Sequence, residues 1–487
     1  MEFPILSVMV WTPFVALLAV LILPGTQAAA IRIVSALAGL VTLVCAIWLW
    51  FAFDATSSDF QFVERIPWIP EWGIDYHLGV DGFSVLLLFL NAIVYLTGVL
   101  TMWHMGTEQR VKEFFVFMHL LVFGVFGVFA SLDLFAFFFF YEIAVLPMYP
   151  LIAIWGSTKK EYAAMKLTIF LMGGSALLFP ALASVFWVAG VDSWSLTDLM
   201  AVEFSAEYQF FIYPFLYLGF GVLAGMFPFH TWSPTGHVAA PTAVSMIHAG
   251  VLMKLGAYGI LRVAMTLFPQ GAEDWAALFG ALATVNIVYG AFVAMRQTDF
   301  KYVIGFSSVS HMGIVLLGLN TMAVDGVNGA VFQMFAHGVM TALFFSAIGF
   351  IYEQTHDRNI ENFGGLVRQV PIAGSFFIVA GLCGVGVPGF ASFWAELLVF
   401  IAAVKTMPVL GVLAVAGLVF TALYMLRVFG KAFFGPVNEK WNHLREPSAW
   451  EIIPRAMLVL VLIGFGFFPS AVLDLIGEAT LGLLGRF

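Results

Sequence analysis

The stretch from Gly221 to Gly259, GVLAGMFPFHTWSPTGHVAAPTAVSMIHAGVLMKLGAYG, decides how this chain folds. It begins and ends as apolar helix, but its middle holds three prolines and three histidines. Proline removes a backbone donor and breaks a helix. Inside a bilayer, such a break is tolerated only where protein or a water-filled cavity satisfies the freed polar groups. Lys254 follows in an apolar run, where an ionisable residue is costly and usually functional. The stretch therefore predicts an ion path beside a broken helix.

The composition places the whole chain in a membrane. Of its 487 residues, 62% are hydrophobic and only 10% are charged, whereas an ordinary soluble domain is about 25% charged. Both cysteines, Cys45 and Cys383, lie in apolar runs, which argues against a disulfide framework or a zinc site. The net charge of −9 argues against a nucleic-acid partner. These features predict an all-α polytopic membrane protein.

About fourteen apolar runs are long enough to cross a bilayer as helices. They lie near residues 3–23, 31–52, 80–103, 113–131, 133–156, 163–189, 208–229, 242–267, 275–295, 302–322, 327–352, 371–404, 407–429 and 450–476. The first run lacks a basic start, so we interpret it as a retained span. The seventh run is interrupted by the prolines of the opening stretch, and the twelfth by GVGVPG at 384–389.

The loop charges predict the orientation of the chain. Most of the 20 lysines and arginines fall in loops on one side, and only Arg65, Lys405 and Arg486 fall in loops on the other. Because cytoplasmic loops collect Lys and Arg, both termini are predicted to face outside. The longest loop, about 53–79, is interpreted as a lid on the outer surface.

Broken helices five spans apart suggest two five-helix units, spans 4–8 and 9–13. Five is an odd number, so the two units would cross the membrane in opposite senses, as in the inverted repeats of transporters. The expected divisions are 1–112 for spans 1–3 with the outer loop, 113–267 and 268–430 for the repeats, and 431–487 for the last span. No nucleotide loop, cysteine cluster or obvious haem ligand pair is present, so we expect no cofactor in this chain.

Several ionisable residues lie inside the predicted spans. Glu142 and Glu396 must be protonated, paired or hydrated there, and the alternative to a functional role is a hydrogen-bonded structural pin. Lys254 is deep in its span, and burial disfavours the charged form of a lysine, which makes it a candidate proton carrier. Lys166 opens its span and is equally well explained as an interface lysine.

Two histidines lie on adjacent spans at similar depth. His311 follows Ser307, Ser308 and Ser310, and His337 stacks with Gln333 and Thr341 on one helix face. A lone buried histidine is usually a hydrogen-bonded core residue. Two of them with polar neighbours predict a path for protons or water.

Four segments together resemble the antiporter-like membrane subunits of respiratory complex I (NADH:quinone oxidoreductase), most closely the M type. They are SLDLFAFFFFYEIAVLPMYPLIAIWG, FPFHTWSPTGHVAAPTAVSMIHAGVLMKLGAYG, RQTDFKYVIGFSSVSHMG and FQMFAHG with the following GFIYEQTHDRNIENFGGL. Glu396 is the residue typical of the M type, and the chain ends soon after the fourteenth span, without the lateral helix of L-type subunits.

The resemblance implies a non-redox proton channel in a membrane arm, driven by quinone chemistry elsewhere in a translocating enzyme. It implies L-type and N-type antiporter-like partners, surrounding lipids, and a prokaryotic inner membrane or an organellar membrane. It implies relay roles for Glu142, Lys254 and Glu396. It also matches Lys166, Lys301, His311 and His337 to positions of the family.

One departure from the family pattern concerns the seventh helix. The family has a lysine a few residues before the first proline of this stretch, and here Leu223 or Ala224 stands in its place. In the family this lysine pairs with the fifth-helix glutamate, so Glu142 lacks its expected partner. A nearby Lys166, His230 or His248 could substitute for it, a partner subunit could supply the charge, or pumping could be altered. An unpaired Glu142 is expected to be protonated at neutral pH.

Three other readings stay open. The chain could belong to a multisubunit cation/proton antiporter, which shares the fold and has no redox chemistry. It could also be a subunit of a related hydrogenase-type complex or of a carbon dioxide-hydrating variant, or have a purely structural role. The partner subunits would distinguish the first two from the leading interpretation.

Overall fold

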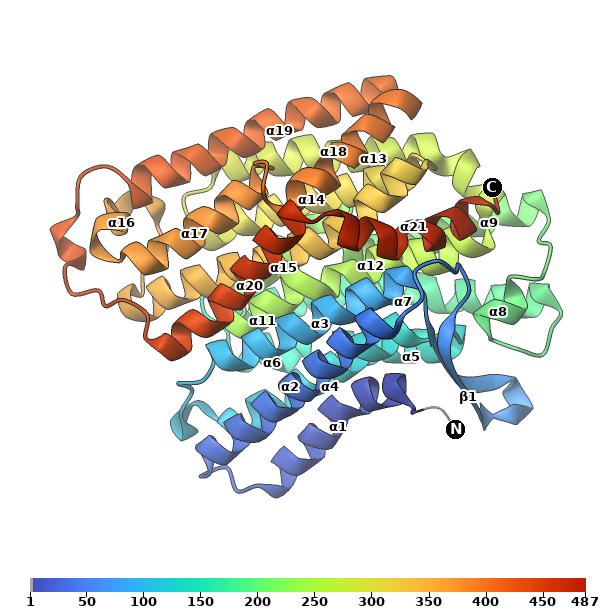
Figure 1. The fold of residues 1–487 in the computed structure, drawn as a ribbon, viewed down its shortest axis with the longest axis horizontal. Helices are drawn as coiled ribbons and strands as arrows, with labels where there is room; N and C mark the ends of the chain where they lie inside the picture. Colours follow the sequence, from blue (N-terminus) through green and yellow to red (C-terminus); the bar gives the residue numbers. More distant parts are fainter. Residues whose placement is uncertain (1–2) are drawn as a thin grey trace.

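The protein is described here by a computed structural model covering residues 3–487. The helices run side by side as one bundle (Figure 1). Within the described residues, thirteen segments are long and apolar enough to cross a membrane. They are α1 (Ile5–Ile22), α2 (Ala28–Ala52), α3 (Gly82–Thr101), α4 (Val111–Ala130), α5 (Leu134–Val145) with α6 (Met148–Trp155), α7 (Lys160–Ala189), α9 (Ala206–Ala224) with α10 (Trp232–Ala239), α11 (Thr242–Ile247) through α12 (Met253–Gly259) to Met265, α13 (Pro269–Arg296), α14 (Phe300–Asn320), α15 (Val324–Thr355), α19 (Pro408–Val428) to Phe433, and α20 (Ala449–Phe467). The expected all-α polytopic fold is confirmed.

The remaining predicted span is a pair of half-helices. Helices α17 (Pro371–Gly384) and α18 (Ala391–Thr406) are each shorter than the other spans. Gly386 and Gly389 turn the chain between them with φ of 74° and 99°, a conformation open to glycine but strained for other residues. The predicted break in the twelfth span is therefore present.

The seventh span is broken as well, between α9 and α10. Helix α9 ends at Gly225, which has φ 74°. The groups freed by the break are satisfied by a side chain from α13: Asn286 Nδ2 donates to the Gly225 carbonyl at 2.9 Å, and Asn286 Oδ1 accepts from the Phe227 amide. Because the break is enclosed by protein, it can lie at membrane depth. The inverted relation between the two five-helix units and the domain divisions stay predictions.

The structure departs from the expected spans at the C-terminal end. The last predicted run, 450–476, is two helices, because α20 ends at Phe467 just before Pro469 and α21 (Ser470–Leu484) follows. Proline cannot continue a helix from the preceding turn. The fifth span is also divided, between α5 and α6, at Pro147. The other short helices are α8 (Leu196–Leu199) and α16 (Leu366–Gln369).

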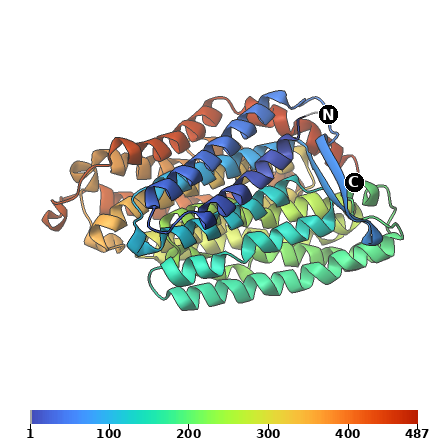
Figure 2. The ribbon, with the colours of Figure 1, turned by 90° about the horizontal axis from the view of Figure 1, so that it is seen from below.

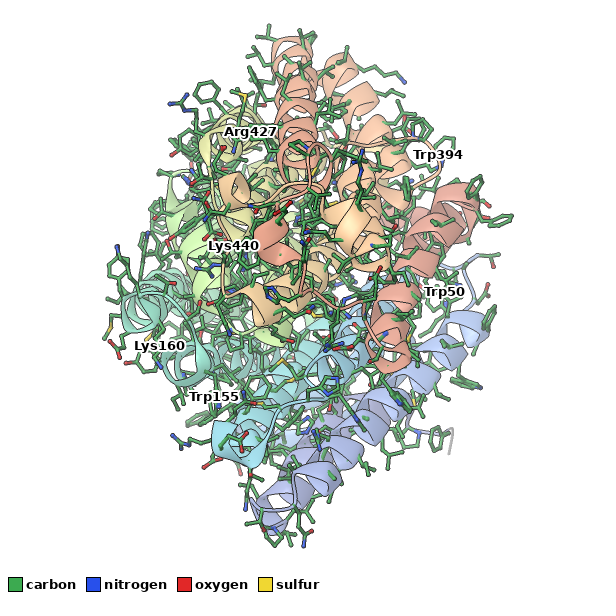
Figure 3. The ribbon with its side chains drawn as sticks, turned by 90° about the vertical axis from the view of Figure 1, so that its left-hand side faces the viewer. Trp50, Trp155, Lys160, Trp394, Arg427 and Lys440 are labelled. Atoms are coloured by element: carbon green, nitrogen blue, oxygen red, sulfur yellow. The ribbon has the colours of Figure 1, made fainter. Side chains whose placement is uncertain are left out.

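Both termini lie at the same end of the bundle, together with the hairpin strand β1 and helix α8 (Figure 1). An end-on view from the opposite end shows Lys160, Arg427 and Lys440 around the bundle (Figure 3). The placement of both termini at one end agrees with an even number of crossings. Helices α11, α12 and α15 are enclosed by the other helices, and every residue of α11 and α12 is buried.

The predicted lid is a β-hairpin, which the all-α expectation did not include. Strand β1 (Gln61–Ile69) pairs antiparallel with β2 (Ile74–Val80), joined by a short turn at Pro70–Trp72. Pro67 disfavours a central strand, but β1 is an edge strand and tolerates it. The hairpin packs across the ends of α1, α4 and α5.

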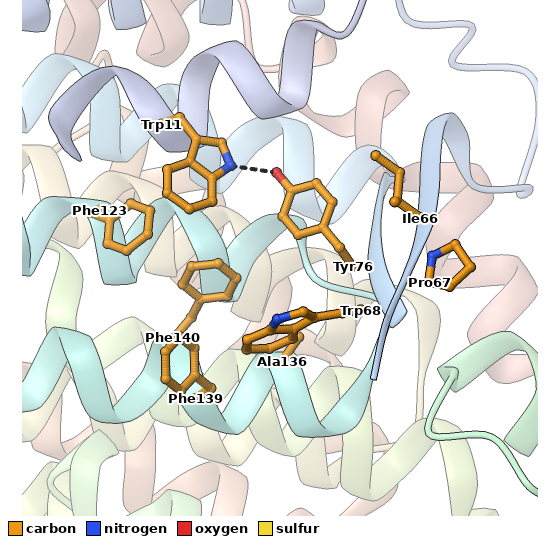
Figure 4. Close-up of a pocket in the computed structure, with 9 residues that line it drawn as sticks. All are labelled: Trp11, Ile66, Pro67, Trp68, Tyr76, Phe123, Ala136, Phe139 and Phe140. Carbon is orange, nitrogen blue, oxygen red and sulfur yellow. Dashed lines mark hydrogen bonds between the residues drawn. The ribbon is translucent and has the colours of Figure 1, made fainter. Parts of the chain in front are cut away.

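Polar contacts fix the hairpin to α1 (Figure 4). Trp11 Nε1 donates to Tyr76 Oη at 3.0 Å, and Ser7 Oγ lies 2.9 Å from the same oxygen. Glu64 Oε1 accepts from the amides of Leu6 and Ser7, so a carboxylate from the hairpin caps the first turn of α1. The hairpin is thus a fixed part of the fold.

The buried histidine of the hairpin gives the fold a pH dependence that can be tested. Burial lowers the pKa of His77 from its usual 6.5 to about 4, and its Nδ1 lies 3.1 Å from Ser195 Oγ. Between pH 6.5 and 4, the unfolded chain binds a proton that the folded chain does not, so the free energy of unfolding falls as the pH falls. We expect this histidine to account for a loss of at most about 2 kcal/mol between pH 6.5 and 5.

The measurement is thermal unfolding of the native chain and of His77→Gln in detergent across this pH range. Burial raises the pKa of the neighbouring Asp133 to about 6, which acts in the opposite direction, so only the difference between the two proteins isolates His77. His104→Gln, at an exposed histidine, is the control. If the stability of His77→Gln changes with pH in the same way as that of the native chain, His77 is not the source of the pH dependence.

Candidate functional site

Lys254 lies at the centre of the bundle and is fully buried. It follows a π-helical segment, His248–Leu252, whose wider turn separates α11 from α12. Its ammonium group donates to the Ala249 carbonyl at 2.5 Å and lies 2.8 Å from His337 Nδ1 on α15. Within residues 3–487, no carboxylate forms an ion pair with it. Its polar partners are therefore a backbone carbonyl, which is neutral, and an imidazole, which can be neutral. Both can accept a hydrogen bond from the ammonium group.

The path continues from His337 toward Glu396. The rings of His337 and His311 have their centroids 5.3 Å apart. His311 Nδ1 then lies 3.2 Å from Glu396 Oε1, and Gln333 Nε2 donates to the same oxygen at 3.2 Å. All of these side chains are buried. The structure thus brings together four ionisable residues that the sequence singled out, from α12, α15, α14 and α18.

The break between α17 and α18 positions the last member of this group. A side chain at Gly386 would place its Cβ 2.8 Å from Glu396 Oε2, so the glycine leaves room for the carboxylate. Several atoms of the group have no hydrogen-bond partner within residues 3–487: His337 Nε2, His311 Nε2, Gln333 Oε1 and Glu396 Oε2. Buried polar atoms are normally paired, so these atoms are the points at which further proton donors or acceptors would bind.

A second histidine pair lies where the end of α10 meets the eighth span, just after α11. The rings of His237 and His248 have their centroids 4.2 Å apart, and Ser233 Oγ lies 2.9 Å from His237 Nε2. Gly236 allows this approach, since a Cβ there would lie 3.1 Å from His248 Cε1. His248 was among the predicted site residues, and His237 was not. Its position in the proline-broken stretch was the available signal.

The other predicted residues lie apart from this group. Lys301 is buried at the start of α14 and donates to the Ala240 carbonyl at 2.8 Å, just after α10. His230 is buried between Phe227 and Tyr289, and neither of its ring nitrogens has a hydrogen-bond partner within residues 3–487. Lys166 is half-buried and donates to Thr235 Oγ1 at 3.2 Å.

Glu142 is separate from all of them. The carboxylate lies half-buried on α5 and accepts a hydrogen bond from Ser175 on α7. In the part of the chain that the structure describes, it forms no ion pair, and none of the three proposed substitutes bonds to it. The group from Lys254 to Glu396 therefore does not include Glu142.

No metal site is visible among residues 3–487, where no three His, Cys, Asp or Glu side chains converge as metal ligands. Cys45 and Cys383 are both free. The absence of a cofactor stays a prediction.

The whole chain is similar to membrane subunits of known complexes. A family model described as NADH:quinone oxidoreductase/Mrp antiporter, TM, matches residues 131–421. NADH-quinone oxidoreductase subunit M of Rickettsia prowazekii (strain Madrid E) is 33% identical over 497 residues, with both chains covered completely. A chain of respiratory complex I from Thermus thermophilus with bound NADH superposes with a TM-score of 0.89 at 26% identity, covering 99% of this chain and 100% of that one. A chain of the Mrp complex from Dietzia sp. DQ12-45-1b also gives a TM-score of 0.89, at 21% identity over 100% of this chain and 98% of that one.

Proposed function

The chain belongs to the family of NADH:quinone oxidoreductase and Mrp antiporter membrane subunits, and we propose that it moves protons across a membrane as subunit M of a complex I-type NADH:quinone oxidoreductase. The complete match to a relative named subunit M supports this parent complex. The likeness to the Mrp chain, at 21% identity, concerns the fold alone. In this proposal the chain itself has no redox cofactor, and quinone chemistry elsewhere in the complex drives it.

The observation that carries the proposal is the buried contact series Lys254–His337–His311–Glu396. A neutral imidazole accepts a proton on one ring nitrogen and releases one from the other. Lys254 would give its proton to His337 Nδ1, 2.8 Å away. His337 would release one from Nε2 toward His311, which lies next to it. His311 would pass one from Nδ1 to Glu396 Oε1, 3.2 Å away. Each imidazole is positively charged after it accepts a proton and neutral again after it releases one, with its remaining proton on the other ring nitrogen. At the end Lys254 has lost one proton and Glu396 has gained one.

Entry to Lys254 would come from the end of the bundle opposite the termini. His237 contacts His248, and His248 begins the π-helical segment that leads to Lys254. The carbonyl of Ala240, three residues after His237, accepts from Lys301, which is buried at that basic end. We assign that end to the inside of the membrane, because most lysines and arginines of the loops are on it. Both termini then face outside. The neighbouring subunits would be the L-type and N-type antiporter-like chains of the membrane arm.

Replacing Lys254 with methionine in the assembled complex, with proton translocation measured against quinone reduction, tests the proposal. Unchanged pumping with normal assembly would contradict it. The second candidate is a cation/proton antiporter subunit, which the matching family model also names in its description. Sodium-driven proton exchange without NADH oxidation, in vesicles that carry the native complex, would favour that candidate.

The state of Glu142 gives a separate prediction. A half-buried carboxyl group whose only described partner is the Ser175 hydroxyl has no cation to stabilise its charge. We therefore expect it to be protonated at pH 7 in the purified chain. Infrared difference spectra of the native chain and Glu142→Gln should contain a carboxylic acid C=O band that is lost in the variant. An ionised carboxylate band in its place would overturn the expectation.

A further inference from the structure

A hollow of about 710 Å³ lies where the hairpin turn meets the end of α7. Figure 2 shows α7 along one edge of the bundle, with the hairpin at its end. The hollow is lined by the hairpin turn, the start of α5, the last turns of α7 and the loop that follows α7. It is far from the Lys254–Glu396 group in the chain and shares no residue with it.

The rim of the hollow is held in one shape by backbone contacts. The Trp194 amide donates to the Gly73 carbonyl at 3.1 Å, and Trp194 Nε1 donates to the Trp72 carbonyl at 3.1 Å. Gly73 turns the hairpin with φ 65°, and a Cβ there would lie 2.3 Å from the Asp192 carbonyl oxygen. The hairpin turn and the loop after α7 are therefore locked together, so the hollow is preformed.

The hollow is polar at one end and apolar at the other. Glu71 and Asp192 lie at the hairpin end, and Phe179 and Ala183 lie deeper along α7. From Trp187 to Phe179 the helix rises by about 12 Å. Trp187 is 79% exposed, close to the end of α7 at Ala189, where indole rings typically mark the membrane–water interface. The hollow thus runs from the interface into the depth of the acyl chains.

The polar end carries unpaired negative charge next to aromatic rings. Neither Glu71 nor Asp192 forms an ion pair or a side-chain hydrogen bond with residues 3–487. The arginine of the hairpin does not neutralise them, because Arg65 is held by Asp75 at 2.6 Å and Asp198 at 3.1 Å. The indole ring of Trp72, exposed beside them, provides a face that attracts a cation.

We propose that this hollow binds a phospholipid whose head group ends in an ammonium ion. The ammonium lies between Glu71, Asp192 and the Trp72 ring, and an acyl chain follows α7 past Phe179. Charge complementarity selects the head group, and the apolar depth of the hollow selects a lipid over a soluble amine. The assignment does not depend on proton translocation.

The test is native mass spectrometry of the full-length chain in detergent, with phosphatidylethanolamine, phosphatidylcholine or phosphatidylglycerol of identical acyl chains added. We expect the two ammonium lipids to be retained about fivefold better than phosphatidylglycerol. The double variant Glu71→Gln/Asp192→Asn should lose this preference, and Trp187→Leu should weaken the retention of all three lipids. The matched control is Glu203→Gln/Glu207→Gln, at exposed acids outside the hollow.

The proposal fails if phosphatidylglycerol binds as well as phosphatidylethanolamine, or if the double variant keeps the native preference. Glycerophosphoethanolamine has the head group but no acyl chains. It therefore distinguishes a site for a lipid from a site for a soluble amine. If this soluble compound binds as well as phosphatidylethanolamine, the assignment to a lipid is wrong. Melting temperatures of the variants equal to that of the native chain show that a lost preference reflects the site and not unfolding.

Discussion

Proton passage through this chain is expected to fall by about a hundredfold or more when Lys254 is replaced by methionine, because the exchange of protons by a positioned group contributes that much. Methionine has a similar length and no proton to give. It leaves His337 Nδ1 without its 2.8 Å partner. Proton translocation driven by NADH in vesicles, divided by the rate of quinone reduction, measures the effect.

A second substitution separates titration from packing at the same position. Lys254→Arg keeps a positive charge and hydrogen-bond donors, but a guanidinium group does not release its proton in proteins. If Lys254 acts by exchanging protons, both variants lose translocation. If the position requires only a cation that holds His337, the arginine variant should pump normally, and the relay would be wrong.

The control for charge removal is Lys405→Met. Lys405 lies in the last turn of α18, with its side chain 69% exposed and 3.9 Å from Asp325. Its replacement should leave translocation and assembly unchanged. Native gels that show the same amount of assembled complex for all variants complete the comparison.

The sequence predicts the parts of this site that depend on a single residue in its local setting. Lys254, His311, His337 and Glu396 are each an ionisable side chain inside an apolar run, and such residues are seldom placed there without a role. The two broken spans were predictable for the same local reason, since proline and glycine interrupt a helix wherever it packs.

The contacts between helices could not be predicted. Which span lies next to which depends on the packing of the whole bundle. That is why the pairing of His237 with His248, across the turn from α10 to α11, was missed, and why none of the expected substitutes for the absent lysine turned out to bond to Glu142. The sequence did not predict the hairpin, because QFVERIPWI does not alternate regularly between apolar and polar residues and contains Pro67. The edge position that tolerates the proline is a tertiary property.

The ion pair between Asp81 and Arg262 was also invisible in the sequence, since its partners are far apart in the chain. Arg262 lies on the span of Lys254, and its Nη2 is 2.5 Å from Asp81 Oδ1. Both side chains are only 5% exposed. Arg262 also donates to Tyr258 Oη at 3.0 Å and Ser84 Oγ at 3.2 Å, and Asp81 caps α3 by accepting from the Ser84 amide. The pair therefore ties the start of α3 to the central span.

Asp81→Asn is expected to lower the free energy of unfolding by about 3–5 kcal/mol, because it leaves a buried guanidinium group without its counter-charge. The double variant Asp81→Asn/Arg262→Met should recover most of this loss, since an apolar replacement removes the uncompensated charge as well. Thermal unfolding of the full-length chain in detergent measures both.

An exposed ion pair in the same chain provides the matched control. Lys431 and Glu361 are also 2.5 Å apart, but both side chains are nearly half exposed. Water screens such a pair, so Glu361→Gln should change the stability by less than about 1 kcal/mol. If Asp81→Asn unfolds at the same temperature as the native chain, the buried charge of Arg262 does not need Asp81 for stability. If the double variant is less stable than the single one, the packing of the Arg262 side chain against Tyr258 and Phe83 dominates over its charge.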